Sequence, residues 1–142
     1  MKLHAPTLSI MLVAESPAFL RSLTHFLEHF ESITIRGLAS EGENAAWLAS
    51  EIRPRVVIVD QGEPGQESGR VTVARVKRAV PDSCIIFVSH DEHECAAAKA
   101  LGAAECIERD RLSLELIPLI RRLLNLERAP RLTLERQHDQ AA

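Results

Sequence analysis

Five short apolar segments alternate with stretches of helical pattern along this chain, and this alternation constrains its fold more than any other feature. The segments are runs of mainly apolar residues, at 8–14, 33–39, 56–59, 85–88 and 104–107. Continuous apolar runs of this length are typical of strands buried on both faces of a parallel sheet. The pattern predicts an α/β fold, a (βα)₅ doubly wound parallel sheet with helices on both faces.

Helix start and stop signals fall between these segments. Ser16 is a good N-cap and Pro17 follows at the first helical position. Pro54 and Pro81 stand where two helices should end, and Gly102 suits the end of another. We expect helices from Pro17 through Phe30 and over 45–52, 71–80, 92–101 and 113–124, with Pro118 kinking the last helix or delaying its start.

Length and charge limit the organisation of the chain. Its 142 residues suit one domain over 1–125, followed by a polar tail or linker over 126–142. With 17 basic and 20 acidic residues the net charge is −3, so we expect no direct contact of this domain with nucleic acid. No apolar run approaches the ~18 residues of a membrane span, and we expect a cytoplasmic protein that binds no membrane. Three cysteines without a CxxC pair predict reduced thiols with no redox or metal role.

Polar residues stand at the predicted carboxyl ends of four strands, where doubly wound sheets carry their sites. They are Glu15, Asp60, Ser89 and Arg109. A carboxylate such as Asp60 can act as a nucleophile toward a phosphoryl group. Because the carboxylate and the phosphoryl group are both anionic, the reaction needs their negative charge neutralised, by a magnesium ion held on carboxylates and by a fixed cation. Glu15 is the candidate second carboxylate, Arg109 the candidate cation, and Ser89 a hydroxyl donor.

The same residues lie in motifs that resemble the receiver domain of two-component response regulators (the CheY-like family). The motifs are LVAESPAFLRSLTHFLE, VVIVDQGEPG, IIFVSH and GAAECIER, in the family's order, and the resemblance covers about residues 8–125. It implies the flavodoxin-like strand order 2-1-3-4-5, with Asp60 as phosphoacceptor and with Ser89 and Arg109 as switch and phosphate contacts. It also implies a magnesium site formed by Glu15, Asp60 and Gly62.

Four departures from the family pattern bear on that site. Ala14-Glu15 replaces an adjacent acidic pair, so we expect magnesium binding to be weak. Arg109 stands where the family has Lys, and its planar fork does not reproduce an ammonium group. Cys106 occupies the switch position without the usual aromatic ring, and His90 is bulky enough to crowd access to Asp60.

These features favour a phosphorylation-dependent switch that receives its phosphate from a sensor histidine kinase or a phosphotransfer protein. The alternative is an atypical pseudo-receiver, a phosphorylation-independent dimerisation or interaction module. An enzyme on the same fold is disfavoured, because the chain lacks the phosphate loop of a flavin protein and has Gly62 where a dehalogenase-type phosphatase needs Asp. We therefore expect no enzyme activity.

Several other features give weaker expectations. The segment RLTLERQ faintly resembles the linker of LuxR-type regulators, so the chain is a candidate N-terminal part of one. A homodimer through the last helix is expected from its apolar residues Leu116, Leu119, Ile120 and Leu123. A metal site in HDEHEC is disfavoured, since acidic residues suit a first helical turn. We expect Trp47 in the core or in a subunit contact.

Overall fold

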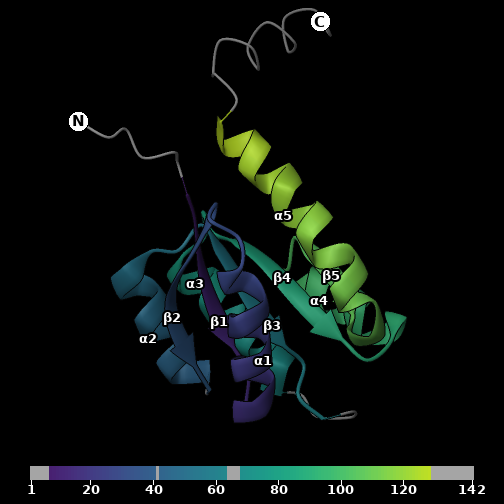
Figure 1. Cartoon of the computed structure of the whole chain (residues 1–142). Coiled ribbons are helices and arrows are strands. Elements are labelled where there is room, and N and C mark those ends of the chain that lie inside the picture. Colours follow the sequence, from purple (N-terminus) through teal and green to yellow (C-terminus); the bar gives the residue numbers. More distant parts are fainter. Residues whose placement is uncertain (1–6, 41, 64–67, 129–142) are drawn as a thin grey trace, which may run out of the picture.

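The computed structural model describes residues 7–40, 42–63 and 68–128. The described residues form alternating strands and helices (Figure 1). In chain order these are β1 (Leu8–Val13), α1 (Pro17–Glu28), β2 (Ile33–Ala39), α2 (Gly42–Ile52), β3 (Val56–Asp60), α3 (Ser68–Ala79), β4 (Cys84–Ser89), α4 (Glu92–Leu101), β5 (Glu105–Glu108), a 3₁₀ turn (Arg109–Arg111) and α5 (Leu112–Arg128).

The strands form one parallel five-stranded sheet in the order β2-β1-β3-β4-β5. This confirms the predicted (βα)₅ fold and its strand order. The central strand β3 is buried over its whole length, as its unbroken apolar sequence predicts.

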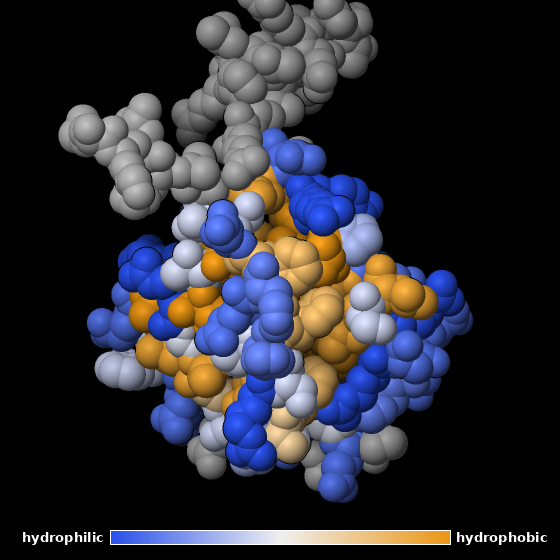
Figure 2. Space-filling view, viewed as in Figure 1, coloured by the Kyte–Doolittle hydropathy of each residue, from blue (hydrophilic) through white to orange (hydrophobic). Residues whose placement is uncertain are grey.

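The two faces of the sheet carry separate cores. Alternate residues of one strand, Leu8, Ile10 and Leu12, pack with α1 and α5. Met11 and Val13 point to the other face, where the core includes residues of α2, α3 and α4. Figure 2 shows apolar side chains gathered on the face that carries α1 and α5.

The capping signals act as predicted. Ser16 accepts a hydrogen bond from the backbone N–H of Phe19 at 3.2 Å, and Pro17 opens α1. Gly102 ends α4 with φ 125°, a conformation that residues with a Cβ rarely adopt. Pro118 does not delay α5, which begins at Leu112 and contains it.

Some expectations about side chains are wrong. Trp47 is 65% exposed, which excludes the core but leaves a subunit contact as the prediction. The apolar residues expected to supply a dimer surface are mostly core instead, because α5 packs its apolar stripe onto the sheet: Leu116, Leu119 and Ile120 are buried, and the partly buried Leu123 packs against the same cluster. The expected tail overlaps α5 at 126–128, and its remainder, 129–142, lies outside the described residues.

Candidate functional site

The carboxyl ends of β1, β3, β4 and β5 bring the predicted site residues to one edge of the sheet. Glu15, Asp60, Gly62 and Arg109 all line one pocket of about 310 Å³, whose other lining residues are Ser16, Glu63 and His90. Ser89 ends β4 beside β3 and β5 but does not line this pocket. Four of the predicted residues therefore share one pocket, while Ser89 is not part of its lining.

Asp60 is the buried acid of this pocket, with its side chain only 3% exposed. Its Oδ2 accepts a hydrogen bond from the N–H of Gly62 at 3.1 Å and lies 3.9 Å from a guanidinium nitrogen of Arg109. Its Oδ1 is buried with no hydrogen-bond partner among the described residues. A buried carboxylate oxygen without a partner is costly, and such an atom is a candidate ligand for a cation.

Burial controls the ionisation of this acid. Desolvation raises the pKa of Asp60 above its ordinary value, and the nearby Glu15 charge raises it further. The Arg109 charge, the hydrogen bond from Gly62 and the His90 charge lower the pKa and offset part of that rise. Arg109 is thus the largest source of stabilisation for the ionised, nucleophilic form.

Arg109 itself is held from two sides. Its guanidinium carbon lies 4.3 Å from the centre of the Phe19 ring, a cation–π contact with α1. Because Arg109 opens the turn after β5, its side chain spans from the Phe19 ring to the Asp60 carboxylate. A planar guanidinium stacks well on a ring, so the Phe19 contact gives a physical reason for Arg at this position.

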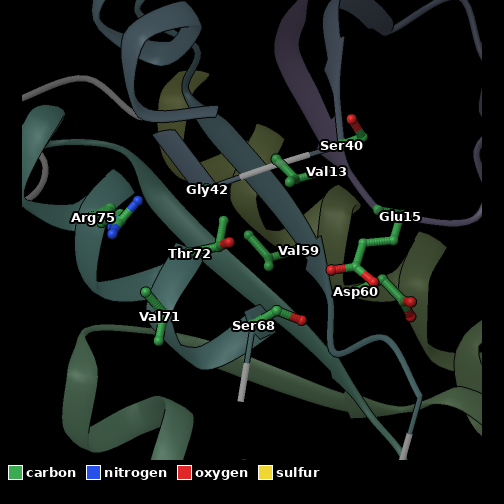
Figure 3. A pocket seen from close by; sticks show the side chains of 12 residues that line it. Val13, Glu15, Ser40, Gly42, Val59, Asp60, Ser68, Val71, Thr72 and Arg75 are labelled. Atoms are coloured by element: carbon green, nitrogen blue, oxygen red, sulfur yellow. The ribbon is translucent and has the colours of Figure 1, made fainter. Parts of the chain in front are cut away.

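Glu15 supplies the second carboxylate. Figure 3 shows its side chain directed toward Asp60, and both acids also line a neighbouring pocket of about 300 Å³ that extends to Thr72 and Arg75. Ala14 also lines this neighbouring pocket, but its side chain offers no metal ligand. The pair Asp60 and Glu15 fits a magnesium ion that keeps several waters, because such sites often have only one or two protein carboxylates.

Gly62, the third predicted metal residue, has only its backbone carbonyl to offer, and that carbonyl is already engaged. His90 Nε2 lies 2.5 Å from the Gly62 oxygen. A carbonyl only accepts, so Nε2 carries the proton of this bond. The backbone N–H of His90 also donates to Gln61 Oε1 at 2.9 Å. His90 therefore ties the loop after β3 to the loop after β4 beside the phosphoacceptor position.

Gln61 and Gly69 pack together where α3 begins beside the end of β3, and the sequence assigned neither of them a role. Gln61 is 1% exposed, and its N–H donates to Val88 in β4 at 2.9 Å. A Cβ on Gly69 would lie 2.7 Å from Gln61 Cα and 3.0 Å from the Asp60 oxygen. Only glycine allows α3 to begin this close to the end of β3.

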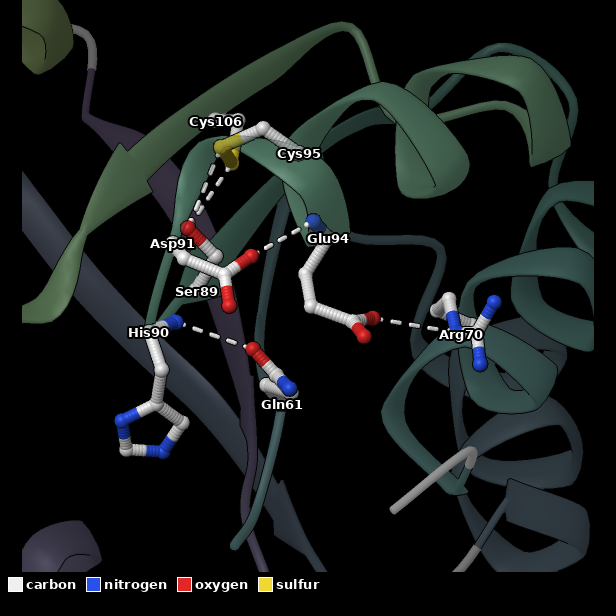
Figure 4. Close-up of polar contacts among 8 residues, drawn as sticks. All are labelled: Gln61, Arg70, Ser89, His90, Asp91, Glu94, Cys95 and Cys106. Carbon is white, nitrogen blue, oxygen red and sulfur yellow. Dashed lines mark hydrogen bonds and ion pairs between the residues drawn. A yellow bond between two sulfur atoms is a disulfide. The ribbon is translucent and has the colours of Figure 1, made fainter. Parts of the chain in front are cut away.

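The cysteine prediction is wrong for two of the three thiols. Cys95 in α4 and Cys106 in β5 form a disulfide with their Cα atoms 5.6 Å apart, and Cys84 is free. The pairing arises because α4 returns the chain alongside the end of β4 before β5 joins that strand. Ser89 Oγ lies 3.1 Å from Cys95 Sγ and 3.5 Å from Cys106 Sγ (Figure 4). Disulfide sulfurs carry no proton, so the Ser89 hydroxyl is the donor.

The acidic HDEHEC segment has a structural explanation. Asp91 caps α4 by accepting a hydrogen bond from the N–H of Glu94 at 2.9 Å. Glu94 pairs with Arg70 of α3 at 3.1 Å. Within the part of the chain that the structure describes, no group of three or more His, Cys, Asp and Glu side chains is arranged to hold a metal.

Comparison with known proteins supports the receiver interpretation. No protein-family model matches the chain. It is 32% identical over 100 residues to the transcriptional activator protein ExaE of Pseudomonas putida, covering 70% of this chain but 46% of that protein. The chain thus spans less than half the length of that curated relative.

Solved structures of response-regulator receiver domains have the same fold as this chain. A two-component response regulator of the LuxR family from Aurantimonas sp. SI85-9A1 matches with a TM-score of 0.74 at 21% identity, covering 84% of this chain and 86% of that one. The signal receiver domain of a DNA-binding response regulator from Colwellia psychrerythraea 34H matches with a TM-score of 0.69 at 26% identity, covering 83% of this chain and 98% of that one.

Among the described residues, no helix is both long and apolar enough to cross a membrane.

Proposed function

We propose that this chain, whose fold matches that of response-regulator receiver domains, is a phosphorylation-dependent switch that accepts a phosphoryl group on Asp60. One observation carries the proposal. Asp60 ends the central strand with a carboxylate that faces Glu15 on one side and has the Arg109 guanidinium 3.9 Å away. A buried acid with a cation beside it, in a pocket at the carboxyl edge of the sheet, suits phosphoryl transfer.

The transfer is a displacement at phosphorus. A carboxylate oxygen of Asp60 attacks the phosphorus atom, the bond from phosphorus to the donor nitrogen breaks, and the departing imidazole of a phosphohistidine takes up a proton. Arg109 supplies positive charge to the oxygens of the transferred group, which cuts the repulsion between two anions. The burial of Asp60 strengthens that attraction, because its side chain is only 3% exposed to water.

Magnesium is the proposed cofactor, held by Asp60 and Glu15. The ion would supply charge neutralisation for the phosphoryl oxygens. The bond from His90 occupies one of the two lone pairs of the Gly62 carbonyl and crowds its approach to a metal ion, and Ala14 offers no side-chain ligand. We therefore propose weak binding.

The proposed partners follow from the receiver fold. A sensor histidine kinase or phosphotransfer protein would supply the phosphate, and a second copy of the chain would bind in a homodimer. Because the relative ExaE is described as a transcriptional activator, we propose that this domain regulates transcription as part of a longer cytoplasmic regulator, without contacting nucleic acid itself and without enzyme turnover.

A second candidate, the pseudo-receiver, is favoured by one specific observation. His90 holds the Gly62 carbonyl and lines the pocket in front of Asp60. If His90 blocks the pocket in this way, Asp60 is not phosphorylated, and the domain acts only as an interaction module. In that case Asp60→Asn leaves oligomeric state and partner binding unaltered.

The deciding experiment is intact mass spectrometry after incubation with magnesium and a small-molecule phosphodonor. The switch predicts a gain of one phosphoryl mass that requires magnesium and is lost in Asp60→Asn. Asp82→Asn is the matched control, because Asp82 is an exposed acid beyond the end of α3. No gain in the wild type and in His90→Ala would reject the switch and leave the pseudo-receiver.

A further inference from the structure

The disulfide links two elements that flank the predicted switch residue. Cys95 lies in the first turn of α4 and Cys106 lies in β5, and both are half-buried. A Cα separation of 5.6 Å suits a disulfide without backbone movement. Partial exposure leaves the pair open to thiol reagents, unlike a pair enclosed in a core.

Ser89 is the third member of this group. It is fully buried, and its hydroxyl donates to the Cys95 sulfur at 3.1 Å while the Cys106 sulfur is 3.5 Å away. Asp60 receives no hydrogen bond from Ser89, since its Oδ2 is bonded to Gly62 and its Oδ1 has no partner among the described residues. In the disulfide form, the hydroxyl that would contact the phosphoryl group is therefore turned to sulfur.

In the described part of the chain, three contacts hold the start of α4. Asp91 caps it, the Arg70–Glu94 ion pair holds it to α3, and the disulfide holds it to β5 (Figure 4). The disulfide is the covalent one of the three. Breaking it leaves the cap, the ion pair and the core packing of Ala98, all non-covalent, so the freedom of the start of α4 to move against β5 increases when this pair is reduced.

We propose that Cys95 and Cys106 form a reversible redox modification site that gates the switch. The disulfide keeps Ser89 on the sulfurs and α4 fixed to β5, and reduction releases both, so that phosphorylation of Asp60 can draw Ser89 toward the phosphoryl group. The gating half of this inference rests on the proposed function, while the redox site itself does not. In the cytoplasmic location proposed above, a disulfide is usually transient and catalytic or redox-sensing, which suits such a site.

The exchange chemistry balances with a dithiol as the reductant. One thiolate of the dithiol attacks a sulfur of the pair, the bond between the two cysteine sulfurs breaks, and a mixed disulfide forms. The second thiolate of the dithiol then displaces the remaining cysteine. Two electrons and two protons pass to the protein, which gains two thiols, and the dithiol becomes a disulfide. The reverse sequence restores the bond.

Cys84 does not belong to the pair. It begins β4, at the opposite end of that strand from Ser89, and burial raises the pKa of its thiol. A thiol with a raised pKa has little thiolate at neutral pH and exchanges slowly. Cys84 therefore provides an internal reference for the two reactive positions.

The redox site is tested by equilibrating the full chain in reduced and oxidised dithiothreitol at varied ratios, followed by denaturing alkylation and intact mass. As the ratio of reduced to oxidised dithiothreitol rises, we expect Cys95 and Cys106 to become alkylated together, a gain of two alkyl groups in one transition. Cys84 should be alkylated at every ratio. Cys84→Ser should keep this transition and Cys95→Ser should abolish it. Three modified thiols at every ratio would overturn the redox site.

Gating is tested on the same samples. Hydrogen exchange over 89–101 should be several-fold faster in the reduced protein, and phosphodonor should give more Asp60 adduct in that form. The double variant Cys95→Ser/Cys106→Ser should show the same exchange in both buffers. Equal adduct in both states would overturn gating while leaving the phosphorylation intact. No adduct in either state would overturn the proposed function and the gating, but a redox transition would still establish the modification site.

Discussion

His90 donates a hydrogen bond from its ring Nε2 to the carbonyl oxygen of Gly62 at 2.5 Å. The receiver resemblance implies that Gly62 helps to hold the metal, so the imidazole contacts the backbone atom that would be the ligand. His90 also lines the pocket that contains Asp60. One side chain therefore limits both metal binding and access of a phosphodonor.

His90→Ala should strengthen magnesium binding and speed adduct formation. A neutral hydrogen bond contributes about 1 kcal/mol net, so its removal should improve apparent magnesium affinity about fivefold. The magnesium dependence of the adduct yield measures this. His93→Ala is the control, since His93 is exposed on α4. Unchanged magnesium dependence in His90→Ala would show that the bond to Gly62 does not limit the site.

Arg109→Gln should slow adduct formation, because Arg109 is the main charge that favours the ionised form of Asp60. Its side chain is 35% exposed, so solvent weakens the effect to on the order of 1 kcal/mol, or about fivefold in rate. Arg109→Lys should keep most of the rate, since it keeps the charge and loses the stacking on Phe19. The matched control is Arg111→Gln, whose partner is Glu115. A slower rate in that control as well would mean that general charge, not position, is responsible.

Asp60→Asn should stabilise the protein at neutral pH. The pKa of Asp60 is raised in the folded state, so the unfolded chain loses this proton more readily and ionisation favours unfolding. The stability linked to protonated Asp60 is complete below the unfolded pKa of 3.8 and is lost as pH rises through the folded pKa. The variant should therefore have a Tm a few degrees higher at pH 7, with the difference shrinking toward pH 3.5. Thermal melts across this range test the prediction, and a lower Tm at pH 7 would contradict it.

Much of the fold and the location of the site could be predicted from the sequence. Strand runs such as 56–59, the Ser16-Pro17 start and the Gly102 stop act locally, through burial pattern and capping, so they are visible without a structure. Asp60 follows from its place at the end of a buried strand.

The remaining features depend on tertiary contacts. Cys95 and Cys106 are separated by 11 residues with no CxxC spacing, and only the return of α4 beside β4 and β5 brings them together. The same holds for His90, which reaches Gly62 across 28 positions. For Trp47 the sequence leaves both core burial and a subunit contact open, and only the tertiary structure, in which α2 places it outward, excludes the core.

Gly69→Ala should distort the site and destabilise the fold. The new methyl group would lie 2.7 Å from Gln61 Cα, a backbone atom that cannot move aside cheaply. Overpacking of this kind costs about 1–3 kcal/mol. Urea unfolding measures the loss, and Ser68→Ala, at the exposed preceding position, should change it by no more than about 0.5 kcal/mol. Equal stability of the two variants would show that α3 shifts to accept the side chain.

Leu114→Glu should weaken the proposed homodimer. Leu114 is 73% exposed near the start of α5. Because the other described leucines of α5 are mostly used in the core, Leu114 is an exposed apolar residue of this helix that remains for a second copy. Gel filtration over a range of concentrations should show the wild type as a dimer and Leu114→Glu as a monomer. Leu101→Glu on α4 is the control, since Leu101 is also exposed, at 42%, and should leave the dimer intact. A wild type that stays monomeric throughout would exclude the homodimer, and a dimer lost only in Leu101→Glu would move the interface to α4.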